Sequence, residues 1–101
     1  MRVMLAYKAN GDAAEDPYSS LLPVGLCSLH AVLRNLGHQS TLANFSSSDW
    51  QEIARQLELY KPEILGVSQF THNRSESLEL AVLAKKQKRV RSLFVYPQPV
   101  L

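Results

Sequence analysis

Short apolar runs alternate with stretches of helical periodicity along this chain. Four runs have the length of a strand, at residues 2–7, 40–45, 64–68 and 92–96. Between them, apolar side chains recur every three or four residues, which is the spacing of one face of a helix. Alternating strands and helices predict a parallel sheet with right-handed crossovers, and therefore an α/β domain.

The polarity of the runs and the chain length define the expected architecture further. The segment 40–45 is more polar than the others, so we place it near an edge of the sheet. We expect an open, doubly wound, three-layer parallel sheet of the flavodoxin-like or Rossmann-like type, with strand order 2-1-3-4. Because such domains normally continue for another helix and strand, we interpret residues 1–101 as a single domain truncated after strand four, a fragment of a longer protein.

The helical stretches have recognisable ends and faces. Pro23 opens the first helix, and Gly37 ends it as a left-handed cap. Ser48 and Gln51 form a candidate capping box for the second helix, and the third is expected over residues 76–86. The apolar faces are expected to consist of Leu26, Leu29, Leu33 and Leu36, then Trp50, Ile53, Ala54 and Leu57, then Leu78, Ala81, Val82 and Ala84.

The charges are unevenly distributed. Residues 1–84 carry six basic and nine acidic side chains, whereas residues 85–91 add five basic ones to give a formal net charge of +2. A nucleic-acid reader needs a basic face spread over the fold, so we do not expect a nucleic-acid partner. Basic residues at the end of a helix complement the negative end of its dipole, which is our interpretation of this run.

The number of cysteines and the absence of long apolar segments indicate the cellular compartment of the protein. The single Cys27 cannot form an intramolecular disulfide, and its apolar helical surroundings predict a packed thiol rather than a metal ligand or nucleophile. The sequence has no signal-like amino terminus and no apolar run of membrane-spanning length. We therefore expect a cytoplasmic protein that does not bind a membrane.

Polar side chains follow the third strand, and they are the strongest candidates for ligand contacts. Residues 64–68 end in Ser68, and Gln69, Thr71 and His72 come next. In open α/β sheets the ligand lies at the carboxyl ends of the strands. The short hydroxyls of Ser68 and Thr71 could donate hydrogen bonds to a large flat ring, or they could cap the next helix. A lone histidine without partners at metal spacing predicts no metal site.

The segment after the first strand is the second candidate. Residues 8–22 are too many for an ordinary strand-to-helix turn, and long loops in compact domains are often functional. Lys8, Asn10 and Gly11 lie beside the third strand if the order is 2-1-3-4, so they are candidate cofactor contacts. An ordinary solvated loop is the alternative interpretation.

Several ligand classes lack their motif in this sequence. The turn after the first strand has one glycine, Gly11, where a dinucleotide fold needs G-x-G-x-x-G, and no P-loop occurs. Ser68 occupies the position at which a phosphoacceptor receiver needs an aspartate. A flavodoxin would need a hydroxyl-rich loop directly after the first strand, where Lys8 and Ala9 stand.

What remains is a resemblance over roughly residues 1–88. The chain is similar to the amino-terminal cobalamin-binding-type domain of radical S-adenosylmethionine (radical SAM) proteins. In that family a Pro-x-Gly-Leu helix, a Gly-His before strand two and a Pro-Asp/Glu-h-h-Gly-h-Ser strand (h, hydrophobic) follow one another. The matching positions are Pro23, Gly25, Leu26, Gly37, His38, Pro62, Glu63, Gly66 and Ser68.

The sequence departs from this family and its relatives at three places. The family's Gly-Gly-Pro-His turn after strand four is replaced here by Tyr96-Pro97-Gln98-Pro99. The Asp-x-His-x-x-Gly signature of cobalamin-dependent mutases is absent after strand one, so no protein imidazole is expected on cobalt. The Cys-x-x-x-Cys-x-x-Cys of the radical domain is also absent, and an iron–sulfur cluster and S-adenosylmethionine would bind only in a downstream domain.

The resemblance implies a cofactor-binding module. It would hold cobalamin over the strand ends through Lys8, Asn10, Gly11 and the polar residues after strand three, without catalysis of its own. The parent enzyme would be a methyltransferase or a cyclase, and the downstream radical SAM domain would be the partner. The alternative is a degenerate α/β docking or substrate-recruiting domain that binds no cobalamin. We also expect a homodimer, formed through an uncovered apolar edge or face of strand four or strand one.

Overall fold

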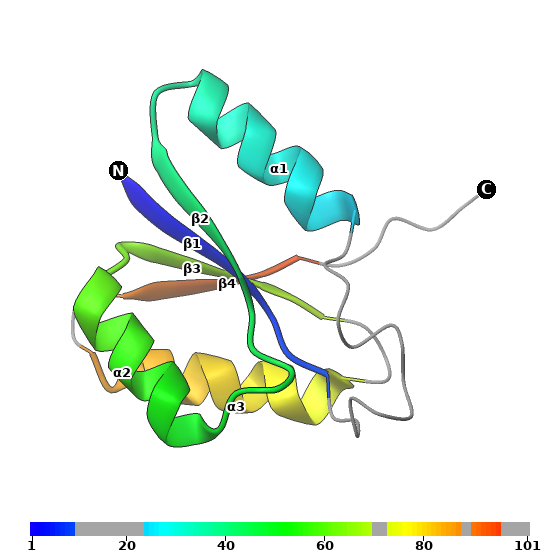
Figure 1. The fold of residues 1–101 in the computed structure, drawn as a ribbon, viewed down its shortest axis with the longest axis vertical. Helices are drawn as coiled ribbons and strands as arrows, with labels where there is room; N and C mark the ends of the chain where they lie inside the picture. Colours follow the sequence, from blue (N-terminus) through cyan, green and yellow to red (C-terminus); the bar gives the residue numbers. More distant parts are fainter. Residues whose placement is uncertain (10–23, 70–72, 88–89, 96–101) are drawn as a thin grey trace.

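The computed structural model describes residues 1–9, 24–69, 73–87 and 90–95. These residues form a four-stranded, all-parallel sheet in the order β2-β1-β3-β4, with helices α1, α2 and α3 between the strands (Figure 1). The predicted α/β fold and strand order are therefore confirmed. The elements are β1 (Arg2–Tyr7), α1 (Val24–Asn35), β2 (Gln39–Asn44), α2 (Trp50–Tyr60), β3 (Ile64–Ser68), α3 (Arg74–Lys85) and β4 (Arg91–Val95).

The alternation of side chains along the central strand β1 divides the core into two halves. Val3, Leu5 and Tyr7 belong to a cluster with Leu26 of α1. The side chains between them on β1 belong to a second cluster with residues of α2 and α3. Figure 1 shows the same division, with α1 on one face of the sheet and α2 and α3 on the other. This is the three-layer, doubly wound arrangement that the sequence predicts.

Gly66 of β3 is where the two central strands fit most closely. A Cβ atom added to it would lie 2.8 Å from Leu5 Cδ2. Real Cβ atoms do not approach other carbons so closely, so any side chain at this position would displace Leu5. Gly66 therefore has a packing role in the core.

Helix ends agree with the predictions at one helix and differ at another. Gly37 has a φ of +87° after α1, as expected for a left-handed cap. The N-cap of α2 is Asp49, whose carboxylate accepts a hydrogen bond from the Glu52 N–H at 2.8 Å. The predicted Ser48–Gln51 capping box is therefore wrong. A carboxylate is favoured over a hydroxyl at this position because it also complements the positive end of the helix dipole.

Three predictions about buried faces are also wrong. Cys27 is exposed rather than packed, and Leu36 at the end of the α1 stripe is 69 % exposed. In α3, Leu78 and Val82 are 46 % and 60 % exposed. Ala84 is buried as predicted, but Ser77 and Leu80 form the rest of the buried face of this helix. The physical reason is that Ser77 finds a hydrogen-bond acceptor in the core, which turns the helix away from its most apolar stripe.

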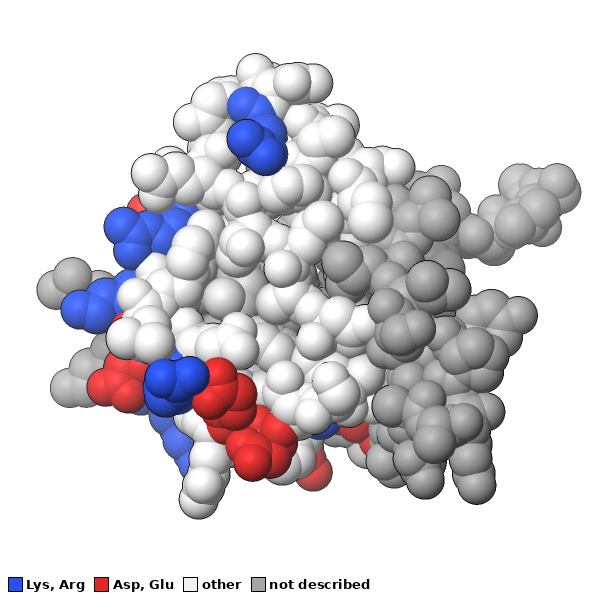
Figure 2. Space-filling view, in the orientation of Figure 1, with Lys and Arg blue, Asp and Glu red and all other residues white. Residues whose placement is uncertain are grey.

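Charged side chains gather on one part of the face shown in Figure 2. In Figure 2 acidic and basic groups cluster below and to the left, whereas the surface over α1 shows one basic patch and no acidic one. Within the described residues, no helix combines the length and apolar character needed to cross a membrane.

Candidate functional site at the carboxyl ends of β1 and β3

The strand order places a topological switch point between β1 and β3. From β1 the chain passes over one face through α1 to β2, and then over the other face through α2 to β3. In open α/β sheets, the usual ligand position is at the carboxyl ends of the two strands between which the crossovers diverge. Lys8 and Ala9 follow β1 here, and Ser68 and Gln69 end β3.

A buried amide joins the two strand ends. Asn73, directly before α3, is fully buried, and its Nδ2 donates to the carbonyl of Lys8 at 3.1 Å and to the carbonyl of Ser68 at 3.0 Å. The amide therefore spans the switch point. It fixes the distance between the backbones of β1 and β3 where a ligand would lie.

Ser68 is held from a second direction. The Ser77 Oγ donates to the Ser68 carbonyl at 3.4 Å, and Ser77 is fully buried. Ser68 itself is 3 % exposed. The end of β3 is therefore a rigid part of the fold.

The amine of Lys8 ties the end of β1 to the turn between β2 and α2. Its Nζ donates to the carbonyls of Phe45 at 3.0 Å and Ser48 at 2.9 Å, and it lies 5.1 Å from the centre of the Trp50 ring. These contacts occupy two of the three N–H donors of the ammonium group. The Lys8 side chain therefore stabilises the turn, and its contacts with the described residues leave one donor for a further acceptor.

Burial sets the electrostatics of this amine. Desolvation lowers the pKa of Lys8 below its usual value of 10.5, and the carboxylates of Glu76, Glu79 and Asp49 oppose this shift. Because the pKa of Lys8 is lowered, the loss of hydration has a larger effect on it than the three carboxylates.

Two further bonds fix β2 against β1 at this edge. The Phe45 N–H donates to the carbonyl of Tyr7 at 2.7 Å, and the Ala9 N–H donates to Ser46 Oγ at 3.0 Å. The carboxyl ends of β1, β2 and β3 are thus joined by side chains as well as by the sheet itself.

Gln69 leaves one polar atom unsatisfied. Its backbone N–H donates to the carbonyl of Val95 at 2.9 Å, which extends the pairing of β3 with β4. Among the described residues, its Oε1 is buried and has no hydrogen-bond partner. A buried acceptor without a donor costs about 1–3 kcal/mol. Such an atom at a switch point is suited to receive an N–H or O–H group of a ligand.

The structure brings together three of the seven predicted contact residues: Lys8, Ser68 and Gln69. The other four, Asn10, Gly11, Thr71 and His72, lie outside the described residues. Sequence reasoning missed Asn73 as the residue that joins β1 to β3. Asn73 lies directly before α3, but its side chain makes no capping hydrogen bond there.

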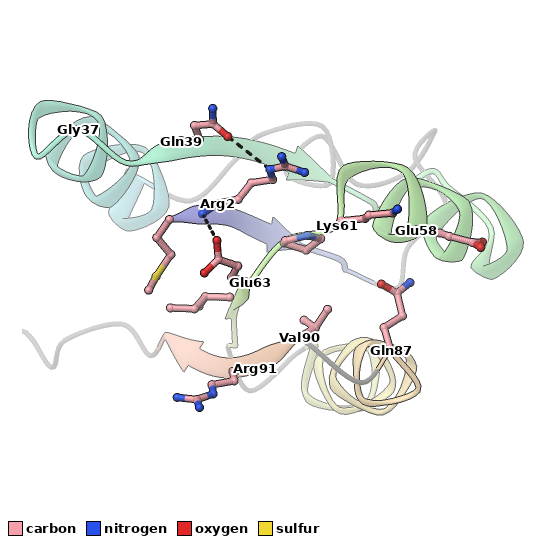
Figure 3. Close-up of a pocket in the computed structure, with 12 residues that line it drawn as sticks. Arg2, Gly37, Gln39, Glu58, Lys61, Glu63, Gln87, Val90 and Arg91 are labelled. Carbon is pink, nitrogen blue, oxygen red and sulfur yellow. Dashed lines mark hydrogen bonds between the residues drawn. The ribbon is translucent and has the colours of Figure 1, made fainter.

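The opposite, amino edge of the sheet has a large open hollow of about 1270 Å³ (Figure 3). Arg2, Lys61 and Arg91 line it together with Glu58 and Glu63. Several of its polar groups are already engaged within the protein.

Arg2 is the best-engaged of these groups. Its guanidinium donates to the Tyr60 carbonyl at 2.6 Å and to Gln39 Oε1 at 3.4 Å. Its backbone N–H donates to Glu63 Oε1, also at 3.4 Å. We therefore assign no ligand to the hollow.

Histidine and acidic side chains do not form a metal centre in the described part of the chain. Within residues 1–9, 24–69, 73–87 and 90–95, no group of three or more His, Cys, Asp or Glu side chains is close enough to hold a metal ion. His30 instead pairs through Nδ1 with Ser40 Oγ at 2.8 Å, which joins α1 to β2.

Comparisons with protein-family models, with curated proteins and with solved structures found no match for this chain.

Proposed function

We propose that this chain is a cobalamin-binding module, the amino-terminal part of a radical SAM enzyme. The observation that carries the proposal is the buried Oε1 of Gln69 at the carboxyl edge of the sheet, which has no hydrogen-bond partner among the residues that the structure describes. The resemblance in the sequence motifs suggests the identity of the ligand. When bound, cobalamin supplies a cobalt centre that can carry a methyl group.

The residues at this edge are compatible with cobalamin. The rim of the corrin carries carboxamide groups, and their N–H donors match the Gln69 acceptor. Ser68 and Ala9 are small, so a flat ring could approach the ends of β3 and β1. Cobalt is held by its own ring and requires no cluster of protein ligands.

In this proposal Gln69 and Ser68 hold the corrin, and the remaining donor of Lys8 contacts it or its tail. Asn10, Gly11, Thr71 and His72 are further contacts proposed from the sequence. The downstream radical SAM domain would face the same edge. The module itself holds and presents the cofactor and performs no radical chemistry.

Cofactor retention tests the proposal directly. The purified chain is mixed with hydroxocobalamin and desalted, and its visible spectrum is recorded. We expect near-stoichiometric retained colour. A folded but colourless protein would contradict the proposal and favour the docking or substrate-recruiting alternative.

A pair of variants tests the position of the site. Gln69→Leu removes the unpartnered acceptor, and we expect it to retain much less cobalamin. Gln56→Leu makes the same chemical change on α2, where the Gln56 side chain donates to Glu52, and we expect it to retain as much as the wild type. Equal retention by the two variants would place the ligand elsewhere.

A further inference from the structure

The side-chain oxygen of Gln69 is an acceptor that only a donor can satisfy. It is buried and has no hydrogen-bond partner among the described residues, whereas the backbone N–H of Gln69 already donates to the Val95 carbonyl at 2.9 Å. A carbonyl oxygen has lone pairs and no proton, so the group opposite it must present an N–H or an O–H. A ligand group with lone pairs alone would leave this buried oxygen unsatisfied and would bind more weakly.

The backbone that carries this acceptor is held on both sides. The carbonyl of the peptide between Ser68 and Gln69 accepts from Asn73 Nδ2 at 3.0 Å and from Ser77 Oγ at 3.4 Å. The N–H of the same peptide is the donor to Val95. Three hydrogen bonds therefore hold one peptide unit, and the Gln69 backbone has little freedom to move away from a ligand group that does not match it. The acceptor is preorganised in this sense.

Acidic side chains gather around the starts of α2 and α3. Both starts lie at the carboxyl edge, because the residues just before them contact Lys8. Asp49 caps α2, Glu76 lies in the first turn of α3, and together with Glu79 they are the carboxylates that act on the Lys8 ammonium group. Arg74, the first residue of α3, is exposed, so solvent screens its charge. A negatively charged ligand group at this edge would therefore be repelled by three carboxylates.

We propose that Gln69 makes this site selective for corrinoids whose rim group at that position is an uncharged carboxamide, and against corrinoids with a carboxylate there. The inference rests on the proposed function. The carboxamide N–H donates to Gln69 Oε1 and brings no charge. A carboxylate in its place would set lone pairs against lone pairs and add a negative charge to an edge that already carries Asp49, Glu76 and Glu79.

Two cobalamin derivatives separate the hydrogen bond from size and charge. In one, a single rim carboxamide is converted to its N-methylamide, and in the other the same group is converted to its methyl ester. The two are uncharged and nearly equal in size, but only the amide has an N–H. Dissociation constants are measured by equilibrium dialysis for each rim position in turn. At one position we expect the wild type to bind the ester at least about tenfold more weakly than the amide.

Variants assign this difference to Gln69. Gln69→Leu should bind the two derivatives equally, and Gln56→Leu on α2 should keep the wild-type ratio. Equal binding of amide and ester by the wild type at every position, or a difference that survives in Gln69→Leu, would overturn the inference and leave cobalamin binding intact. A wild type that does not bind hydroxocobalamin would overturn the proposed function as well.

The carboxylate at the same rim position tests the charge. We expect it to bind the wild type more weakly than the ester does, and the ratio of the two dissociation constants to fall in Glu76→Gln. Glu58→Gln is the matched control, because Glu58 is exposed and lines the hollow at the opposite edge. A carboxylate that binds as well as the carboxamide, or equal ratios in the wild type and both variants, would contradict the proposed selectivity.

Discussion

The two edges of this sheet differ in how far their polar groups are satisfied by hydrogen bonds within the protein. At the amino edge a wide hollow is lined by charged side chains, and one of them, Arg2, donates hydrogen bonds to acceptors of the protein. At the carboxyl edge the strand ends are joined by buried groups, and the Oε1 of Gln69 has no donor in the described part of the chain. We therefore place the proposed site at the carboxyl edge, where a buried acceptor lacks a donor among the described residues, and not at the edge with the larger hollow.

The largest effect on stability should come from removing the Asn73 amide that bridges the ends of β1 and β3. Asn73→Ala removes both hydrogen bonds across the switch point and leaves the Lys8 carbonyl without this donor. We expect a loss of about 3 kcal/mol in the free energy of unfolding, measured by urea denaturation.

Ser77→Ala is the matched control for Asn73→Ala. It removes the other donor to the Ser68 carbonyl, at 3.4 Å, but leaves the bridge to β1 intact. Its cost should be about 1 kcal/mol. Equal losses in the two variants would show that the bridge between β1 and β3 has no special role.

Replacing one basic residue by methionine at each edge compares how much the two edges contribute to stability. Lys8→Met leaves the carbonyls of Phe45 and Ser48 without their donor, so we expect a loss of about 2 kcal/mol at neutral pH. Arg2→Met at the amino edge removes a partly buried bond to Tyr60 O, and its cost should be about 1 kcal/mol. Urea denaturation measures both. A larger loss of unfolding free energy for Arg2→Met than for Lys8→Met would contradict the expectation that the carboxyl edge contributes more to stability.

Gln69→Leu should have an unusual effect on the free protein. It removes a buried acceptor that has no donor among the described residues, so the free energy of unfolding should stay the same or rise by about 1 kcal/mol. Gln56→Leu breaks a hydrogen bond to Glu52 and should give no such gain. A clear loss of stability in Gln69→Leu would mean that the side chain is already satisfied within the fold.

Raising the pH into the alkaline range should have the smallest effect on stability. The contributions of Lys8 and Tyr60 to stability should change in opposite directions. Burial lowers the pKa of Lys8 below 10.5, so the unfolded chain binds more protons just below that pH, and this group's contribution to stability rises with pH there. Burial raises the pKa of Tyr60 above 10.0, so the unfolded chain loses its proton first, and that contribution falls as the pH passes 10.0.

Differences between variants and wild type isolate these contributions. Lys8→Met should remove the rise, and Tyr60→Phe should remove the fall, in unfolding free energies measured from neutral pH to above pH 10.0. Curves for the two variants that run parallel to the wild type would contradict the assigned directions.

The sheet could be predicted from the sequence because its signals are local. Each strand is a short apolar run, and the third strand was predicted with the observed bounds, Ile64–Ser68. The strand order followed from the polarity of residues 40–45 and from the rules of doubly wound folds. The position of the site at the carboxyl edge depends on the same rules.

The errors arose where tertiary contacts override local pattern. Ser77 is buried because its hydroxyl reaches the Ser68 carbonyl, which a count of apolar residues in α3 cannot reveal. Asn73 contacts Lys8 across 65 positions of sequence, so its role appears only when β1 and β3 lie side by side. Cys27 lies on an apolar helix surface that faces outward, and periodicity alone does not distinguish that surface from the buried one.

The most direct test of the carboxyl-edge site is the stabilisation of the protein by its ligand. Unfolding is followed with and without excess hydroxocobalamin for the wild type, Gln69→Leu and Gln56→Leu. A ligand that binds only the folded state stabilises it by about 2.7 kcal/mol at a hundred times its dissociation constant. We predict this stabilisation in the wild type and Gln56→Leu and a much smaller one in Gln69→Leu, although that variant is at least as stable when free. Equal stabilisation of all three, or none in the wild type, would contradict the account.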